Sequence, residues 1–239
     1  MLYLIGLGLN SDGITKEGLD ALQKCKRVYL ENYTVDFPYS AGELKDKLNL
    51  KKIILANREK VESLEIVDEA KKLNIALLIY GAPLIATTHI SLIQEAKICK
   101  IKYKIIYSAS VIDAVSETGL QIYKFGKIAS MPKWQKNYEP DSFIKIVKDN
   151  LSIESHSLIL VDIGLDVYDA LNQLEIATKN NDIKLNKIII CQSLGTNKRK
   201  IFYRNFDELR EFDNVRKPYC IIIPGKLHFI EKEVLEGFS

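Results

Sequence analysis

The sequence is poor in the residues on which several kinds of site depend. Its 239 residues include four cysteines, three histidines, two methionines and one tryptophan. The cysteines are far apart, and no two have the short spacing of a zinc site. We therefore interpret them as small hydrophobic side chains in a reducing compartment. They are Cys25, Cys99, Cys191 and Cys220.

The chain also lacks charge of a single sign and long apolar runs. Its 34 basic and 31 acidic residues are intermixed, with a net charge of +3. This excludes a committed DNA-binding surface, and we expect no direct nucleic-acid partner. No run approaches the roughly 20 apolar residues that span a bilayer. Residues 1–9 are too short for a secretory signal, so we expect a cytoplasmic protein without a membrane partner.

Familiar catalytic patterns are missing too. We find no Ser/His/Asp pattern, no P-loop and no glycosidase-like pair of carboxylates, so no catalytic residue is named. The three histidines have no acidic partners at ligand spacing, which predicts no metal site. His156 lies in a polar turn and is expected to be solvated, while His89, at a predicted helix start, is expected to be structural. His228, three residues after Gly225, is the best placed of the three to meet a ligand.

In the first half, apolar β-branched runs alternate with helical patterns. Thr15 is the expected N-cap of the first helix, and Gly18 is a mild weakness inside it. Strands that alternate with helices in this way indicate βαβ units and a mainly parallel sheet. The predicted strands are 2–9, 28–33, 52–56, 75–80 and 103–107, and the predicted helices are 15–24, 41–48, 64–73, 88–98 and 111–117.

The pattern changes near residue 119, after which strands outnumber helices. This indicates a second α/β domain with a mixed sheet, and we place the domains at residues 1–120 and 121–239. Asp141 is the expected cap of the helix that follows it. The predicted strands are 128–131, 157–163, 187–192, 200–203 and 219–223, and the predicted helices are 141–151, 167–179 and 231–236.

Turns rich in glycine and small residues stand where predicted strands end. In parallel sheets these ends bind ligands, so the turns predict a pocket floor. In the turn at 80–89, Thr87 and Thr88 are possible caps for the next helix. The Gly6-Leu7-Gly8 turn resembles a dinucleotide fingerprint, but Ser11 replaces the third glycine, which favours another ligand. The turns are 6–8, 80–89, 108–111 and 224–228.

Four stretches of the chain resemble the diphthine synthase family, the diphthamide-pathway branch of the tetrapyrrole methylase superfamily. The resemblance runs from residue 2 to about residue 236, in order and at compatible spacing. The first stretch is shared across the superfamily, whereas the other three are more specific to the family. The four stretches are residues 2–9, 81–89, 118–127 and 224–228.

The resemblance implies a methyltransferase of two α/β domains that binds S-adenosyl-L-methionine in a cleft between them and releases S-adenosyl-L-homocysteine. Its implied partner is translation elongation factor 2, on which the family methylates the amino group of 3-amino-3-carboxypropyl-histidine to give diphthine. The family is also expected to be homodimeric. A same-fold enzyme acting on a corrinoid or ribosomal RNA, and a non-catalytic cofactor-binding regulator, are the alternatives.

The resemblance also implies eight cofactor contacts. One of them departs from the family, because Ala82 stands where the turn usually reads Gly-Asp-Pro and its carboxylate is therefore missing. A hydrogen bond to an ionised group is typically worth about 1.5 to 3 kcal/mol, so we expect weaker cofactor binding. The implied contacts are Leu9, Ala82, Ile85, Ser110, Val111, Val161, Ser193 and His228.

Overall fold

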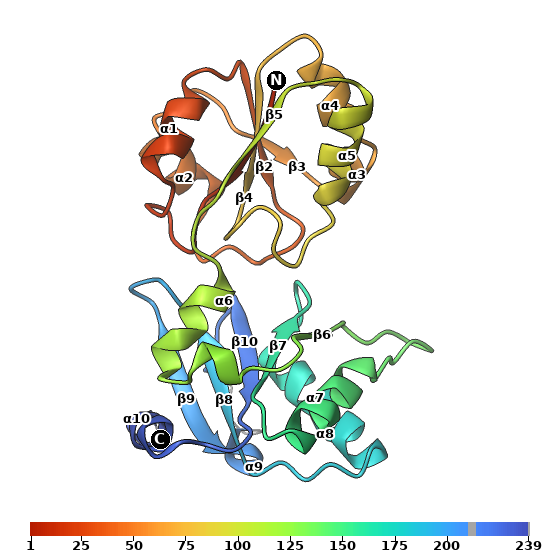
Figure 1. Ribbon diagram of the computed structural model, residues 1–239, viewed down its shortest axis with the longest axis vertical. Helices are drawn as coiled ribbons and strands as arrows, with labels where there is room; N and C mark the ends of the chain where they lie inside the picture. The colour runs from red at the N-terminus through yellow and green to blue at the C-terminus, as the bar shows by residue number, and fades with distance from the viewer. Residues whose placement is uncertain (210–213, 239) are drawn as a thin grey trace. The chain divides into compact units, whose positions relative to one another are not determined.

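The computed structural model describes residues 1–209 and 214–238. The chain divides into two compact units, Met1–Asp113 and Ala114–Ser239, each with its own five-stranded sheet (Figure 1). One sheet is entirely parallel and the other is mixed. This confirms the predicted α/β class with a parallel first sheet and a mixed second sheet.

The first unit alternates strands and helices, as the sequence predicts. Its strands run in the order β3-β2-β4-β1-β5, and every neighbouring pair is parallel. The strands are β1 (Leu2–Gly6), β2 (Arg27–Glu31), β3 (Ile54–Ala56), β4 (Ile75–Ile79) and β5 (Tyr103–Ile106). The helices are α1 (Lys16–Leu22), α2 (Ala41–Lys47), α3 (Arg58–Glu62), α4 (Glu65–Ala70), α5 (Ile90–Ile98) and α6 (Val111–Ala114).

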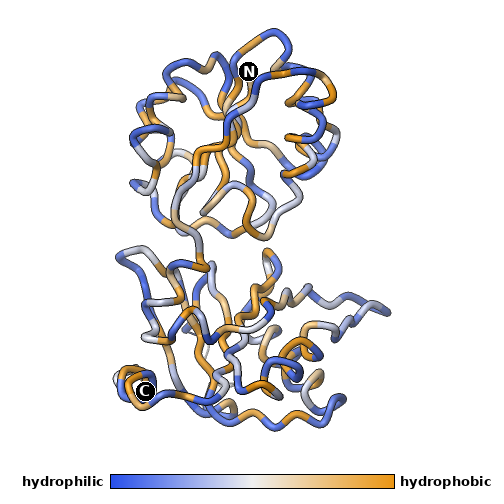
Figure 2. Tube along the Cα trace, viewed as in Figure 1, coloured by the Kyte–Doolittle hydropathy of each residue, from blue (hydrophilic) through white to orange (hydrophobic). Residues whose placement is uncertain are grey.

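Both faces of this sheet are covered, because successive strand residues point to opposite sides. Leu2 and Leu4 pack with residues of α3, α4 and α5, whereas Tyr3 and Ile5 pack with residues of α1 and α2. The helices therefore form a layer on each side of the sheet (Figure 1). Burial on both faces explains why these strands are continuously apolar, as the hydropathy colours of Figure 2 show.

The strand order creates a switch point beside β1. From β1 the chain passes to β2 on one side, and from β4 it crosses to β5 on the other side, so that β1 pairs with both β4 and β5. The carboxyl ends of the strands at such a point are where α/β sheets bind ligands. The turns that follow β1, β4 and β5 all lie at this edge.

The second unit has a mixed sheet in the order β6-β7-β10-β8-β9, in which only β6 and β7 are parallel. Its strands are β6 (Ala129–Met131), β7 (Ser157–Val161), β8 (Lys187–Gln192), β9 (Lys200–Asn205) and β10 (Tyr219–Ile223). Its helices are η1 (Val115–Thr118), η2 (Ile122–Lys124), α7 (Ser142–Ser152), α8 (Val167–Asn180), α9 (Phe206–Leu209) and α10 (Phe229–Glu236). Phe143, Ile144 and Leu174 from α7 and α8 pack with strand residues in one core.

Several local predictions are confirmed and others need correction. The Thr15 hydroxyl accepts a hydrogen bond from the Gly18 backbone, which confirms the cap of α1. Gly18 itself is required, because a Cβ there would lie 2.7 Å from Ile14 and 3.0 Å from Ile5. Asp141 precedes α7 but makes no capping bond, since its carboxylate accepts from the Asn181 side chain instead.

The boundaries of other elements also differ from the predictions. The helix expected from residue 111 to 117 is four residues of α6 followed by the 3-10 turn η1. The short helices α3 and α9 were not predicted, because one or two turns give too little periodicity to recognise.

Candidate functional site

Backbone hydrogen bonds join the turns that follow β1 and β4. The Gly8 amide donates to the Gly81 carbonyl at 3.3 Å, and the Gly81 amide donates to the Gly8 carbonyl at 3.0 Å. Both glycines have positive φ, +68° and +70°, a conformation that residues with a Cβ seldom adopt. The two turns therefore form one rigid piece at the carboxyl edge of the first sheet.

The close approach of these turns requires glycine at the end of β1. A Cβ on Gly6 would lie 2.6 Å from the Gly81 carbonyl oxygen and 3.1 Å from the Ser108 nitrogen. A Cβ on Gly81 would have its nearest neighbours at 3.8 Å, on Ala109 and Ser110. The β4 turn thus reaches across the end of β1 and faces the turn that follows β5.

The β5 turn is closed by its own side chains. The amide and the hydroxyl of Ser110 both donate to Asp113 Oδ2, at 2.7 and 3.1 Å, and the Ile112 amide donates to the Ser110 hydroxyl at 3.2 Å. Ser110 is buried. The carboxylate of Asp113 therefore holds the shape of this turn.

His89 stabilises the β4 turn through a hydrogen bond to the Pro83 carbonyl, which agrees with its predicted structural role. It is fully buried, and its Nδ1 lies 3.2 Å from the Pro83 carbonyl, which can only accept, so Nδ1 carries the proton. Burial lowers the pKa of His89, although Glu31 and the bond to Pro83 oppose the shift. The neutral ring fixes the Pro83 carbonyl.

The threonines of this turn do not cap α5 in the predicted way. The helix begins at Ile90, with His89 as N-cap and no side-chain capping bond. The Thr87 hydroxyl accepts from the His89 amide at 3.3 Å and donates to the Pro83 carbonyl at 3.4 Å. Thr87 therefore stabilises the turn rather than the first turn of the helix.

Five of the eight predicted cofactor contacts lie at this edge of the first unit. Leu9 and Ala82 are buried, and the Leu9 carbonyl accepts from the Tyr80 hydroxyl at 3.0 Å. Ile85 is 39% exposed, and its amide donates to the Ala82 carbonyl. Ser110 and Val111 belong to the β5 turn and the start of α6. The structure brings these five residues onto neighbouring turns.

The other three predicted contacts lie in the second unit, but at two different edges of its sheet. Val161 ends β7, and Ser193 follows β8 with its amide bonded to the Pro218 carbonyl, which places both near the start of β10. His228 follows the other end of β10, where Ile223 pairs with Ser157. A five-residue strand spans roughly 15 Å. Within one chain, His228 is therefore not brought together with Val161 and Ser193.

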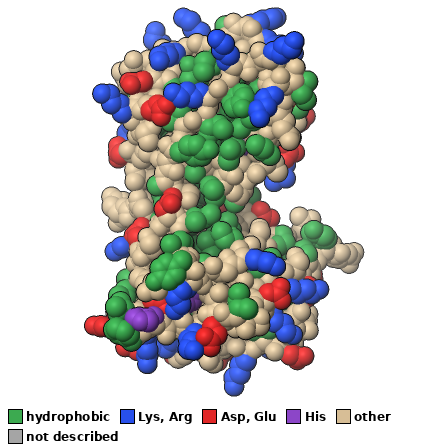
Figure 3. Space-filling view, in the orientation of Figure 1, with side chains coloured by type: hydrophobic (Ala, Val, Ile, Leu, Met, Phe, Trp, Pro, Cys, Tyr) green, Lys and Arg blue, Asp and Glu red, His purple; other side chains and the backbone are tan. Residues whose placement is uncertain are grey.

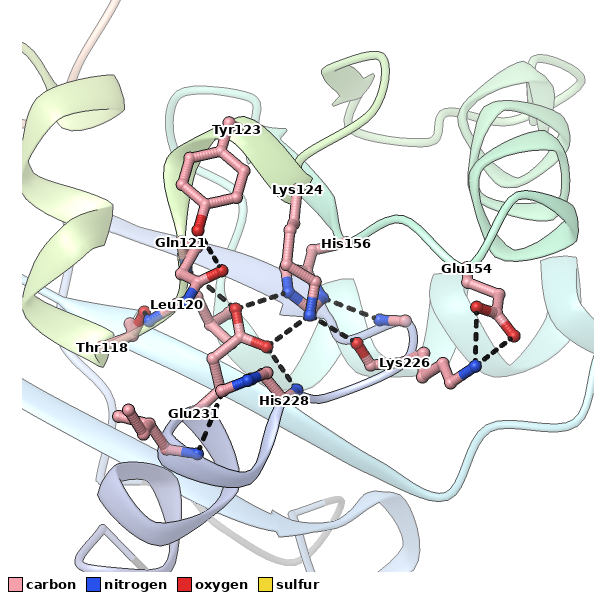
Figure 4. Close-up of polar contacts among 12 residues, drawn as sticks. Thr118, Leu120, Gln121, Tyr123, Lys124, Glu154, His156, Lys226, His228 and Glu231 are labelled. Atoms are coloured by element: carbon pink, nitrogen blue, oxygen red, sulfur yellow. Dashed lines mark hydrogen bonds and ion pairs between the residues drawn. The ribbon is translucent and has the colours of Figure 1, made fainter.

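His228 is the N-cap of α10, and beside it lies a buried carboxylate that sequence reasoning missed. Glu231 is fully buried. Its Oε1 accepts from the Gln121 amide at 3.0 Å, and its Oε2 accepts from the His228 amide at 2.7 Å and from Lys124. Figure 4 shows these groups converging on the carboxylate. The characteristic stretches 118–127 and 224–228 thus meet at one residue.

His156 completes this network, and its predicted solvation is wrong. It is fully buried, accepts from the Gly225 amide through Nδ1 at 3.0 Å, and places Nε2 3.2 Å from Glu231 Oε1. Since Nδ1 accepts, Nε2 carries the proton. Burial lowers the pKa of His156 against the attraction of Glu231. Its polar neighbours in the sequence concealed the fact that the turn folds inward.

The network keeps Glu231 ionised, and the tight packing of this region requires glycine at position 225. Burial by itself would raise the pKa of Glu231, but hydrogen bonds from Lys124, from the backbone of Gln121 and His228 and from His156 lower it to about 2. At Gly225 a Cβ would lie 2.4 Å from the Glu154 carbonyl oxygen. A capping residue followed three positions later by glutamate is a sequence signal that could have found Glu231.

Across residues 1–209 and 214–238 no group of three or more His, Cys, Asp or Glu side chains could hold a metal ion. No helix in the same part of the chain is long and apolar enough to cross a membrane. On the face drawn in Figure 3, acidic and basic side chains are interspersed.

Comparison with known proteins finds similarity along the whole chain. The profile of the Tetrapyrrole (Corrin/Porphyrin) Methylases matches residues 1–210. A diphthine methyl ester synthase of Schizosaccharomyces pombe is 34% identical, covering 100% of this chain and 94% of that protein. A diphthine synthase of Methanococcus maripaludis is also 34% identical, covering 99% and 98%. A crystal structure of diphthine synthase superposes with a TM-score of 0.90 at 27% identity, covering 100% of this chain and 95% of that one.

The buried carboxylate predicts a pH-dependent contribution to stability. We expect Glu231→Gln to lower the free energy of unfolding by about 2 to 3 kcal/mol at pH 7, because a lowering of the pKa from 4.5 to about 2 corresponds to roughly 3 kcal/mol. A depressed pKa gives stability that is present above pH 4.5 and is lost as the pH falls toward 2. Urea unfolding of variant and wild type between pH 7 and pH 2.5 measures the difference.

The matched control is Glu236→Gln, which removes a carboxylate from the exposed side of the same helix, where Glu236 lies 3.9 Å from Lys232. We expect it to change the stability by less than about 0.5 kcal/mol. A difference between Glu231→Gln and wild type that stays constant from pH 7 to pH 2.5 would contradict this assignment.

Proposed function

Because the chain belongs to the diphthine synthases of the tetrapyrrole methylase family, we propose that it methylates translation elongation factor 2 in diphthamide biosynthesis. The methyl donor is S-adenosyl-L-methionine, and S-adenosyl-L-homocysteine leaves as product. The acceptor is the amino group of 3-amino-3-carboxypropyl-histidine, which becomes diphthine. Similarity to diphthine synthases over the full length carries this proposal, and it favours this acceptor over a corrinoid, ribosomal RNA or a purely regulatory role.

The turns of the first unit fit the proposed cofactor. S-adenosylmethionine needs backbone groups at close range and small side chains around them, and the switch point of a parallel sheet offers both. The bends hold Gly6, Gly8, Gly81 and Ala82, and the space on the Cβ side of Gly81 is open to 3.8 Å. We propose cofactor contacts at Leu9, Ala82, Ile85, Ser110 and Val111, with Val161, Ser193 and His228 contributed by the second unit.

The position of His228 bears on the proposed assembly. Val161 and Ser193 lie at the edge of the second sheet where β10 begins, and His228 follows the end of that strand. We propose a cytoplasmic homodimer, in which the His228 of one copy has access to a cofactor that the other copy binds. This arrangement would reconcile the eight proposed contacts with the register of the sheet.

The proposed reaction mainly requires the protein to orient the acceptor amine relative to the cofactor. The sulfonium of the cofactor supplies a methyl group that is already activated for transfer. The chain has to hold a neutral amine in line with the methyl–sulfur bond and to keep water away from it, and such positioning accounts for large rate enhancements without a catalytic triad. Turns joined by the Gly8–Gly81 bonds and supported by His89 suit this task.

The proposed function predicts transfer of label to the elongation factor. Incubation with methyl-labelled S-adenosylmethionine and elongation factor 2 that bears the 3-amino-3-carboxypropyl arm should label the factor, and mass spectrometry should count the added methyl groups. Mild alkali removes a methyl ester but leaves N-methyl groups, so it distinguishes the two products that the relatives' names indicate. Factor without the arm is the control. Binding of cofactor without transfer to the armed factor would contradict the proposal.

Because Ala82 stands where the family has an aspartate, we predict that restoring the carboxylate raises the affinity for the cofactor. We expect Ala82→Asp to bind S-adenosylmethionine about tenfold to a hundredfold more tightly than wild type, because a hydrogen bond to an ionised group contributes about 1.5 to 3 kcal/mol. Calorimetric titration measures this. Ala82→Asn, with the same shape and no charge, is the matched control. Equal affinities of wild type and Ala82→Asp would rule this prediction out.

The proposed role of His228 predicts a loss of affinity that its capping role does not explain. His228 accepts from the Ile230 amide as N-cap of α10. His228→Asn keeps a good capping residue, whereas His228→Ala removes it at a cost of about 1 kcal/mol. We expect both variants to bind S-adenosylmethionine at least fivefold more weakly in calorimetry, and only His228→Ala to melt earlier. Unchanged cofactor affinity in His228→Asn would leave His228 as a cap alone.

A further inference from the structure

Three aromatic rings form a cluster at the carboxyl edge of the first sheet. None of the three residues is among the proposed cofactor contacts. Phe37 and Tyr39 lie between β2 and α2, and Tyr80 follows β4 directly. The ring centroids are 5.4 Å apart for Phe37 and Tyr39, 5.2 Å for Phe37 and Tyr80, and 6.4 Å for Tyr39 and Tyr80. All three residues are half-buried, and Phe37 and Tyr39 also pack against one of the first unit's core clusters.

The aromatic cluster adjoins the turns proposed to hold the cofactor. The Tyr80 hydroxyl donates to the Leu9 carbonyl at 3.0 Å. Tyr80 is also the residue before Gly81, whose backbone is bonded to Gly8. The cluster is therefore attached at two points to the backbone that follows β1 and β4.

Tyr39 carries a polar atom without a partner. Its hydroxyl is buried, and no described residue forms a hydrogen bond with it. Burial, with smaller effects of Tyr80 and Glu43, raises the pKa of Tyr39, so the hydroxyl stays protonated and neutral. An unsatisfied buried hydroxyl costs about 1 to 3 kcal/mol. Such a group is expected where a ligand supplies the missing contact.

Negative charge lies beside the aromatic cluster. The Ser11 hydroxyl donates to Glu43 Oε1 at 2.8 Å, which holds the carboxylate in place. The nearby Lys47 forms its ion pair with Asp12 instead, and no lysine or arginine pairs with Glu43 in the part of the chain that the structure describes. Aromatic faces and a carboxylate without a counter-ion both attract cations.

We propose that the Phe37–Tyr39–Tyr80 cluster binds a methylated onium cation at the site of methyl transfer. The inference rests on the proposed function, in which one reactant and one product are of this class: the cofactor is a sulfonium, and the neutral amine becomes a trimethylammonium when it is fully methylated. A trimethylammonium has no N–H to donate, so the faces of aromatic rings are the groups best suited to recognise it. The Tyr39 hydroxyl oxygen and Glu43 would then face its polarised methyl groups.

Tetramethylammonium tests the cluster without any need for turnover. Broadening of its proton NMR signal measures its binding to the full chain, with sodium chloride keeping the ionic strength constant. We expect Phe37→Leu and Tyr39→Leu to weaken binding about three- to tenfold each, and the neutral isostere tert-butanol not to bind. Tyr103→Leu, which removes a partly buried tyrosine from the amino end of β5, is the matched control and should bind like wild type.

Two further measurements distinguish the source of the cation. If the cluster serves the sulfonium, Tyr39→Leu weakens calorimetric binding of S-adenosylmethionine three- to tenfold but leaves the neutral S-adenosylhomocysteine unchanged. If it serves the substrate, both cofactor affinities persist, tetramethylammonium competes with armed elongation factor, and the variants accumulate less of the fully methylated product. Tyr39→Phe, which keeps the ring, should retain most of the tetramethylammonium binding.

The proposal is overturned if wild type does not bind tetramethylammonium, or if the cluster variants match wild type in all three measurements. Its failure is distinguishable from failure of the proposed function. A chain that methylates the factor but ignores tetramethylammonium refutes only the cation site. A chain that binds tetramethylammonium through Phe37 and Tyr39 but labels no factor refutes only the function.

Discussion

The close approach of backbone around the end of β1 is the constraint on which the first unit depends. Because β1 lies between β4 and β5, their turns can meet only if β1 ends in a residue without a side chain, and Gly6 satisfies this. The Gly8–Gly81 bonds then replace the hydrogen bonds that the ended strands no longer make. The proposed cofactor turns, the support from His89 and the position of Tyr80 all follow from this junction.

The second unit depends on the buried carboxylate of Glu231, whereas the first unit depends on the close approach of backbone at Gly6. Burying a carboxylate is unfavourable unless donors surround it, and Glu231 receives donors from Lys124, His156 and two backbone amides. Loss of the Glu231 carboxylate would leave these donors without this acceptor. The network therefore fixes η2, the start of β7 and the first turn of α10 relative to one another. It has no evident part in chemistry, although it sets where His228 stands.

In the proposed reaction, the cofactor and the methylated amino group require different kinds of binding surface. Cofactor binding needs rigid turns, which the first unit builds from glycine, alanine and serine. Recognition of a methylated cation needs electron-rich surfaces that do not depend on N–H donors. The segment between β2 and α2 brings two aromatic residues to the same edge. In the proposed function, one sheet edge thus meets both requirements.

The sequence by itself determined the alternation of elements, the two kinds of sheet and the turns at strand ends, because periodicity and glycine placement are local properties. The resemblance of four stretches also identified the family, because their residues and their order can be read directly from the sequence. Only the tertiary structure decided that His156 is buried, that Glu231 joins two distant stretches, and that Phe37 and Tyr39 meet Tyr80. It also placed His228 at the other sheet edge from Ser193. Burial, strand register and long-range partners depend on contacts between residues far apart in the chain, which no local pattern specifies.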